Sequence, residues 1–167
     1  RYGLLFCNLL LGLKGHVGFL CNKSILIVGG ITAQKVVQRT VYCYDICENK
    51  WSEKSMFGKP VTSAAVCVGD DNAYLCGGSD QDKTTPDQNV YDTIYEYNSA
   101  GDVWITKGNM LEARYRHSCC YINNNIYIVG GIGTRSDVSR STCMQSFDLE
   151  TCQCSRLKDM PHALHST

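Results

Sequence analysis

The chain lacks any surplus of charge: its 167 residues include 16 Lys and Arg against 16 Asp and Glu, and charged residues make up 19% of the composition. Binding to a phosphate backbone or to an anionic membrane surface depends on clustered positive charge. We therefore expect neither a nucleic-acid nor a membrane partner. Proline is also scarce, with 3 residues, whereas 44% of the chain is hydrophobic and includes 10 Tyr, 4 Phe and 2 Trp. This apolar content supports a packed core rather than a disordered chain.

The chain also lacks the paired cysteine spacing of a disulfide scaffold or a zinc site, although it contains 11 cysteines. An odd number at irregular spacing does not match the even sets of small secreted domains. The closest pairs are Cys43 with Cys47, Cys119 with Cys120, and Cys152 with Cys154. None repeats the two Cys-x-x-Cys units that suit tetrahedral zinc. We expect reduced cysteines that pack as small hydrophobic residues in a reducing compartment such as the cytoplasm, and no metal or other cofactor.

The apolar N-terminal stretch, residues 1–13, is too short to span a bilayer but has the length of a signal-peptide core. Two interpretations stay open: a secretory signal, or the remainder of a preceding structural unit in a longer protein. A glycosylation sequon at Asn22-Lys23-Ser24 would matter only for a secreted chain.

The chain is rich in glycine, and its glycines mark an internal repeat. Three apolar runs, at residues 25–30, 73–78 and 126–131, each end in a Gly-Gly pair, and the pairs recur at intervals of about 50 residues. Each pair is followed by a tyrosine or phenylalanine and then, in two units, by a tryptophan at the same spacing. The repeated residues are Gly29, Gly30, Tyr44, Trp51, Gly77, Gly78, Tyr97, Trp104, Gly130, Gly131 and Phe147. A methionine comes next in each unit: Met56, Met110 and Met160.

Each repeat is predicted to form four short β-strands. The first follows Gly15-His16 or Arg116-His117, the second ends in Gly-Gly, the third is rich in β-branched and aromatic residues, and the fourth surrounds the tryptophan. No window of comparable length has a helical period, so we predict an all-β chain. The glycine pairs would let backbones approach closely, and the aromatic residues would pack one sheet on the next.

This pattern resembles the kelch-repeat family, in particular its kelch-like (BTB/kelch) members, over residues 14–167. The resemblance implies repeats at 14–60, 61–113 and 114–160, with 161–167 opening a fourth, and four-stranded antiparallel blades arranged as a β-propeller. Because a closed ring uses about four to eight blades, the chain would supply part of one. Two departures are visible. Ser63-Ala64 stands at the start of the second unit, and Cys154 replaces the tryptophan, which we expect to weaken packing on a following blade.

The predicted partner-binding residues lie in the loop between the second and third strands, because this loop differs in length among the units. Variable loops on a constant scaffold usually carry specificity. The candidates in these loops are Thr32, Gln34, Lys35, Asp80, Gln81, Asp82, Lys83, Thr134, Arg135 and Asp137. The resemblance places the start of the first strand on the same face, which implies Arg114, Arg116 and His117 as contacts for an acidic peptide. The alternative for Arg114 is a structural role typical of the family.

The resemblance implies a protein–protein interaction module, most often the substrate-recruiting part of a kelch-like adaptor of a cullin-type ubiquitin ligase with an upstream BTB region. An actin-binding, cytoskeletal kelch protein is the alternative, and a kelch-fold copper oxidase is a third candidate. A copper site needs converging histidines, whereas His16, His117, His162 and His165 follow the repeat. Neither a Ser/His/Asp set nor a phosphate-binding glycine loop occurs. We therefore expect no enzymatic activity.

Overall fold

The structure is a computed structural model that describes residues 12–70, 72–81, 87–133 and 141–162. Every regular element in these ranges is a β-strand, which confirms the predicted all-β class. The same ranges contain no helix that is long and apolar enough to cross a membrane.

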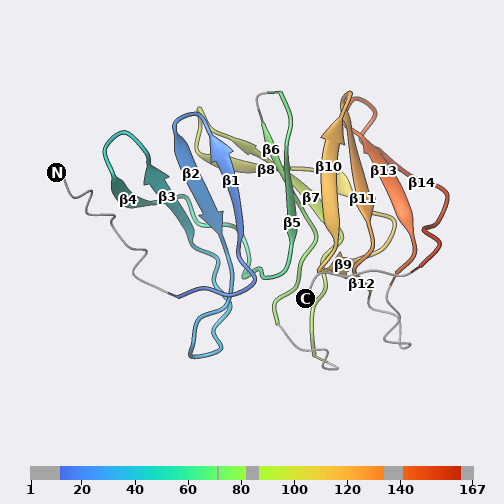
Figure 1. Cartoon of the computed structure of the whole chain (residues 1–167), viewed down its shortest axis with the longest axis horizontal. Helices are drawn as coiled ribbons and strands as arrows, with labels where there is room; N and C mark the ends of the chain where they lie inside the picture. Colours follow the sequence, from blue (N-terminus) through green and yellow to red (C-terminus); the bar gives the residue numbers. More distant parts are fainter. Residues whose placement is uncertain (1–11, 71, 82–86, 134–140, 163–167) are drawn as a thin grey trace.

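Twelve of the strands form three four-stranded antiparallel sheets, which we call blades 1, 2 and 3 (Figure 1). Blade 1 consists of β1 (Val17–Cys21), β2 (Ser24–Val28), β3 (Val41–Asp45) and β4 (Lys50–Lys54). Blade 2 consists of β5 (Ala65–Val68), β6 (Ala73–Cys76), β7 (Thr93–Asn98) and β8 (Val103–Asn109). Blade 3 consists of β10 (Ser118–Ile122), β11 (Asn125–Val129), β13 (Met144–Asp148) and β14 (Gln153–Arg156). A short pair, β9 (Arg114–Tyr115) with β12 (Ile132–Gly133), precedes and interrupts blade 3.

The blades stand side by side in chain order, as Figure 1 shows. Strand β5 contacts both β1 and β10, so the first strand of each blade lies against the first strand of its neighbour. The loop that follows β2 projects from the lower end of the molecule in Figure 1, and the hairpins joining the first and second strands of the blades lie at the upper end. This radial arrangement is the one expected for propeller blades.

The glycine pairs occupy the places where one blade meets the next. Gly29 and Gly77 have φ angles of +63° and +59°, a region that side-chain-bearing residues rarely adopt. A Cβ on Gly77 would lie 2.5 Å from the carbonyl oxygen of Arg114, in the connection to blade 3. The next residue, Gly78, donates its N–H to that same carbonyl at 2.9 Å. The pairs are therefore glycine because both their backbone conformation and the close approach of the next blade exclude a side chain.

A hydrogen bond from the repeated tyrosine closes the turn between the third and fourth strands. Tyr44 donates its hydroxyl to Asn49 Oδ1 at 2.7 Å, and Tyr97 donates to Asp102 Oδ1 at 2.7 Å. The other carboxylate oxygen of Asp102 accepts hydrogen bonds from the N–H and the hydroxyl of Ser55, which follows blade 1. These bonds, with the Tyr97 bond, lower the pKa of Asp102 despite the opposing effect of partial burial. Asp102 thus ties blade 2 to blade 1.

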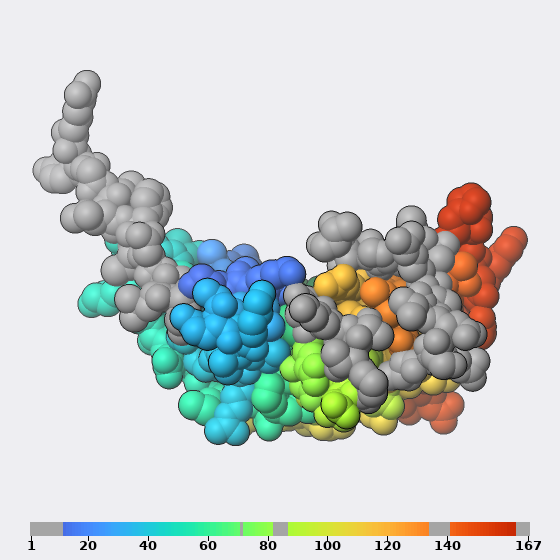
Figure 2. All heavy atoms as spheres, turned by 90° about the horizontal axis from the view of Figure 1, so that it is seen from below, coloured from blue at the N-terminus to red at the C-terminus, as the bar shows by residue number. Residues whose placement is uncertain are grey.

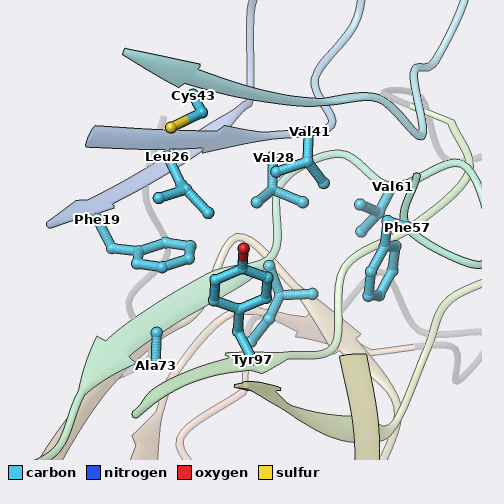
Figure 3. Packing of buried hydrophobic residues seen from close by; sticks show 10 residues of the cluster. Phe19, Leu26, Val28, Val41, Cys43, Phe57, Val61, Ala73 and Tyr97 are labelled. Carbon is cyan, nitrogen blue, oxygen red and sulfur yellow. The ribbon is translucent and has the colours of Figure 1, made fainter. Parts of the chain in front are cut away.

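The interface between blades 1 and 2, which we call the first interface, is apolar and rich in aromatic rings. Figure 3 shows side chains of blade 1, among them Phe19, facing Ala73 and Tyr97 of blade 2. The Phe19 ring meets those of Tyr97 and Trp104 edge-on, with centroid distances of 6.0 and 6.3 Å. Phe57, from the connection between the blades, packs edge-on against Trp104 at 5.2 Å. Each such aromatic contact adds stabilisation beyond the apolar area that it buries.

The direction of this packing corrects one expectation. Tyr97 and Trp104 pack on the preceding blade, so Cys154, at the tryptophan position, faces blade 2 and cannot weaken packing on a following blade. The methionine repeat is also corrected by one position. Met56 is 55% exposed, and the buried residue that corresponds to Met110 is Phe57, which makes the matching backbone hydrogen bond to Arg39.

The interface between blades 2 and 3, the second interface, is more mixed in character. Its buried residues from both blades are Cys67, Tyr74, Cys76, Ile94, Met110, Ile126, Ile128, Phe147 and Leu149. The rings of Tyr74 and Tyr121 stack across it in parallel planes, 6.2 Å between centroids. Cys119 and Cys154 of blade 3 pack against the same cluster. Sulfur therefore fills places that aromatic rings fill in the first interface.

Candidate partner-binding site

The candidate site is the lower end of the molecule in Figure 1, which Figure 2 views directly. It combines the loops after β2 and β6 with the segments that lead into β1, β5 and β10. Among the sequence-predicted contacts, Asp82, Lys83, Thr134, Arg135 and Asp137 lie outside the described residues. The described candidates lie in the loop after β2, in the loop after β6 and in the segment that leads into β10. They differ in burial and in their hydrogen-bond partners.

The loop after β2 is held in shape by Thr32, and it presents its tip to solvent. Thr32 is 8% exposed; its N–H donates to the Val36 carbonyl, and its carbonyl accepts from the N–H of Lys35, both at 3.0 Å. Lys35 has a φ of +67°, which turns the chain at this point. Gln34 and Lys35 are exposed, so they are available to a partner, whereas Thr32 shapes the turn.

The loop after β6 is closed at its base by polar residues that the sequence predicts as contacts. The carboxylate of Asp80 accepts hydrogen bonds from the N–H of Asn89 at 2.9 Å and from its side-chain amide at 2.6 Å. The carbonyl of Gln81 accepts from the Ser79 hydroxyl at 2.6 Å and from the Gln88 amide at 3.0 Å. Asp80 and Gln81 are half-buried, and these bonds fix the direction in which the loop leaves the blade.

Arg114 is an internal residue, which corrects its assignment as a ligand contact. Its side chain is 0% exposed and donates to the carbonyls of Gly130 at 2.9 Å and Cys143 at 3.2 Å. It also pairs with Glu112 at 3.5 Å. A guanidinium with several donors in fixed geometry suits this role, because one side chain binds the carbonyl that follows β11 and the carbonyl that precedes β13. The structural alternative for Arg114 is the one that the geometry favours.

His117 is likewise buried, at 5% exposure, and is removed from the set of ligand contacts. A Cβ on Gly131 would lie 2.7 Å from its Cβ, and one on Gly77 would lie 2.9 Å from its ring. Burial first, and the neighbouring charge of Arg114 second, lower the pKa of His117 to about 3. The imidazole is therefore neutral at physiological pH and fills space between two glycine pairs.

Arg116 remains a cationic candidate at this end, together with Lys35. It is half-buried, with a φ of +54°, and its N–H donates to the Ser63 carbonyl at 2.8 Å. Ser63, with a φ of +55°, in turn donates its N–H to the carbonyl of Gly15 at 2.7 Å. Gly15, Ser63 and Arg116 therefore occupy one equivalent position in successive blades and form a hydrogen-bonded chain across the first strands. A non-glycine residue in this conformation is strained, and such strain is often stored at ligand sites.

Sequence reasoning missed a cationic contact between the blades. The Lys59 ammonium lies 3.6 Å from the centroid of the Tyr91 ring and 5.7 Å from that of Tyr95. The Tyr91 hydroxyl donates to the carbonyl of Pro60 at 3.1 Å. Neither Lys59 nor Tyr91 belongs to the repeat pattern, so no spacing signal marked them. Among the described residues, no group of three or more His, Cys, Asp or Glu side chains is arranged to hold a metal ion.

Comparison with known proteins identifies the family. The model of the KLHDC2/KLHL20/DRC7 Kelch-repeats domain matches residues 15–164, and the chain belongs to this kelch-repeat family. It is 26% identical over 149 residues to Kelch-like protein 26 of Danio rerio, covering 89% of this chain and 24% of that protein. It is 26% identical over 155 residues to Kelch-like protein 36 of Rattus norvegicus, covering 90% of this chain and 24% of that protein. The chain thus spans about a quarter of the length of these relatives.

The fold is supported independently by a solved structure, that of YjhT. It aligns with a TM-score of 0.71 and 19% sequence identity, and the alignment covers 89% of this chain and 52% of that chain. The chain is a part of a kelch-type β-propeller, and its kelch-like relatives support a protein-interaction module.

Proposed function

We propose that this chain is the substrate-recruiting kelch part of a kelch-like adaptor of a cullin-type ubiquitin ligase, that it acts in the cytoplasm, and that it has no catalytic activity of its own. Its contact surface is the end that carries Gln34, Lys35 and Arg116. The protein would be held to the ligase through a BTB region upstream of this chain. One similar protein carries that domain in its name: Kelch repeat and BTB domain-containing protein 12 of Homo sapiens, 25% identical over 118 residues, covering 67% of this chain and 19% of that protein.

The observation that carries the proposal is that some polar residues at this end form hydrogen bonds within the molecule, whereas others are exposed to solvent. Thr32, Asp80 and Arg114 are satisfied within the molecule and fix its loops. Gln34 and Lys35 are exposed, and Arg116 has a strained backbone conformation in the segment that leads into β10. A fixed turn that presents Gln34 and Lys35 to solvent, together with an arginine at the same end, suits recognition of an acidic segment, because arginine can bind a carboxylate through two hydrogen bonds.

The experiment uses the full-length gene product and a displayed library of random peptides as the probe. Selected peptides are expected to be acidic, and their affinity is expected to fall at least tenfold in Arg116→Ser. Serine is the matched substitution because Ser63 already adopts this conformation in blade 2. The control is Lys23→Gln, which removes one positive charge from the exposed β1–β2 turn at the opposite end. If Arg116→Ser and the unchanged protein bind the selected peptides with equal affinity, this surface is not the binding site.

The ligase role has a separate test. The full-length product should co-precipitate a cullin, and deletion of its upstream region should abolish this association while peptide binding persists. A coding sequence without a BTB region would contradict the adaptor role, and sedimentation of the product with filamentous actin would favour the cytoskeletal alternative.

A further inference from the structure

Three cysteine thiols meet in the second interface, away from the candidate binding surface. Cys67 on β5 and Cys76 on β6 belong to the buried cluster between blades 2 and 3, and Cys119 on β10 packs against that cluster from blade 3. Side-chain hydrogen bonds join Cys67 to Cys119 and Cys119 to Cys76. Cys119 therefore reaches across the boundary between the two blades to both Cys67 and Cys76.

The repeat explains why Cys67 and Cys119 face one another. Cys67 pairs in register with Tyr74, as Phe19 pairs with Leu26 in blade 1, so Cys67 corresponds to Phe19. Cys119 pairs with Ile128, as Val66 pairs with Leu75, so Cys119 corresponds to Val66. In the first interface, Phe19 and Val66 both lie in the shared apolar cluster. The second interface places two thiols where the first has an aromatic ring and an aliphatic side chain.

We propose that Cys67 and Cys119 form an inter-blade disulfide when the protein meets a small-molecule disulfide oxidant, and that this bond locks blade 3 onto blade 2. Strands β5 and β10 are the contacting first strands of these blades, so the bond would join the two blades directly. Cys76 lies one strand further out and is 0% exposed, which makes it the less favourable partner for Cys119.

The chemistry is two successive thiol–disulfide exchanges. The thiolate of Cys119, the less buried of the pair, attacks one sulfur of the oxidant, forms a mixed disulfide and releases one small thiol. The sulfur of Cys67 then attacks the Cys119 sulfur, forms the protein disulfide and releases the second small thiol. Two electrons pass from the protein to the oxidant, and the two thiol protons of the cysteines end on the released small thiols.

The environment of the thiols sets when this reaction occurs. The hydrogen bond with Cys119, and then burial, raise the pKa of the Cys67 thiol far above its usual range. The hydrogen bond with Cys67 lowers the pKa of Cys119, but the bond with Cys76 and burial outweigh it, so the net shift is strongly upward. Because the thiolate is the attacking species, exchange is slow and the pair stays reduced unless the oxidant is in excess.

The test treats the full chain, under native conditions, with excess oxidised glutathione and then blocks the remaining thiols by alkylation. Chymotrypsin cleaves after Tyr74 and so separates Cys67 from Cys76. The Cys120→Ser variant leaves Cys119 as the single thiol in its peptide; Cys120 is exposed and pairs with Tyr127 on the other face of β10, so this variant is also the matched control. Mass spectrometry of the unreduced digest then identifies the linked peptides.

A peptide joining Cys67 to Cys119 is expected to be the main linked species in both the unchanged chain and Cys120→Ser, and to be absent from Cys119→Ser. The thermal unfolding midpoint should rise on oxidation and return on reduction, because the bond closes a long loop of the unfolded chain. A stable glutathione adduct, a bond from Cys119 to Cys76, or no linkage in a chain that stays folded would overturn the proposal.

Discussion

The two interfaces are built on the same backbone pattern but are filled by different side chains. The first interface holds Phe19, Phe57, Tyr95, Tyr97 and Trp104. At the corresponding positions the second interface holds Cys67, Met110, Gln145, Phe147 and Cys154. At these five positions the first interface is therefore an edge-to-face aromatic cluster, whereas the second interface has two cysteines, a methionine, a phenylalanine and a buried amide.

The second interface also buries polar atoms that lack partners. Gln145 and Arg114 are both 0% exposed, and within the described part of the chain Gln145 Nε2 and Arg114 Nε have no hydrogen-bond acceptor. A buried polar group without a partner costs about 1–3 kcal/mol. The first interface carries one such atom, Trp104 Nε1. The repeat therefore determines where two blades meet, whereas the side chains at that place determine how stable the interface is.

The largest expected effect comes from truncating the connection side chain in each interface. Phe57 is 1% exposed and Met110, its counterpart, is 4% exposed. Phe57→Ala should lower the free energy of unfolding by about 3–5 kcal/mol. Met110→Ala should lower it by about 1 kcal/mol less, because only Phe57→Ala also removes ring contacts, those with Tyr95 and Trp104. Urea denaturation of both variants measures the difference. Equal losses in the free energy of unfolding would show that the two interfaces are equally strong at this position.

The next effect is a pH dependence that belongs to the second interface. The unfolded chain protonates His117 near its ordinary pKa of 6.5, whereas the folded protein does so only near pH 3. The unfolded state therefore binds more protons in this window, and stability falls by about 1.4 kcal/mol per pH unit as the pH drops below 6.5. Denaturation midpoints at pH 7 and pH 5 measure this loss.

The matched variant is His117→Ala, because Ala64 holds the corresponding position in blade 2. This variant should lose stability at neutral pH and should retain little of the pH dependence between pH 7 and pH 5. His16→Ala, at the exposed counterpart in blade 1, should leave the dependence unchanged. A full pH dependence in His117→Ala would show that another group carries it.

The smallest expected effect concerns the tyrosine that ties the first interface to its turn. Tyr97→Phe removes the hydroxyl that donates to Asp102, and it should cost about 1 kcal/mol. Phe147 already has this form in blade 3, where Cys152 stands in the place of Asp102. Tyr44→Phe, which breaks the bond to Asn49 within blade 1, is the comparison. If Tyr97→Phe costs nothing, the Asp102 bridge to Ser55 alone holds this part of the first interface.

The repeat and its physical reasons could be predicted from the sequence. The glycine pairs and the aromatic positions recur at fixed spacing, and both properties follow from what a blade requires at those places. The direction of packing could not be predicted from the sequence, because a repeat shows which residues correspond but not whether they face the preceding or the following blade. Cys154 was therefore assigned to the wrong side. The one-residue error at Met56 arose because Met56 and Phe57 are adjacent apolar residues, and only burial separates them.

The candidate site was predicted only in part. The loops could be located from the sequence. The sequence does not separate side chains that are exposed to solvent from side chains that hold the loops in shape. Arg114 and Arg116 differ by two positions, yet one is buried against carbonyls and the other follows a strained turn. That difference depends on the carbonyls of Gly130 and Cys143, which are brought to Arg114 by the folding of blade 3. No local pattern records such a partner.

The most direct test of the account is native-state hydrogen exchange at increasing urea, comparing β2 of blade 1 with β11 of blade 3. These are equivalent second strands, each paired on both sides within its blade. The amides of β11 are expected to lose protection at lower urea than those of β2, because the second interface is the weaker one. Simultaneous loss, or earlier loss in β2, would contradict it.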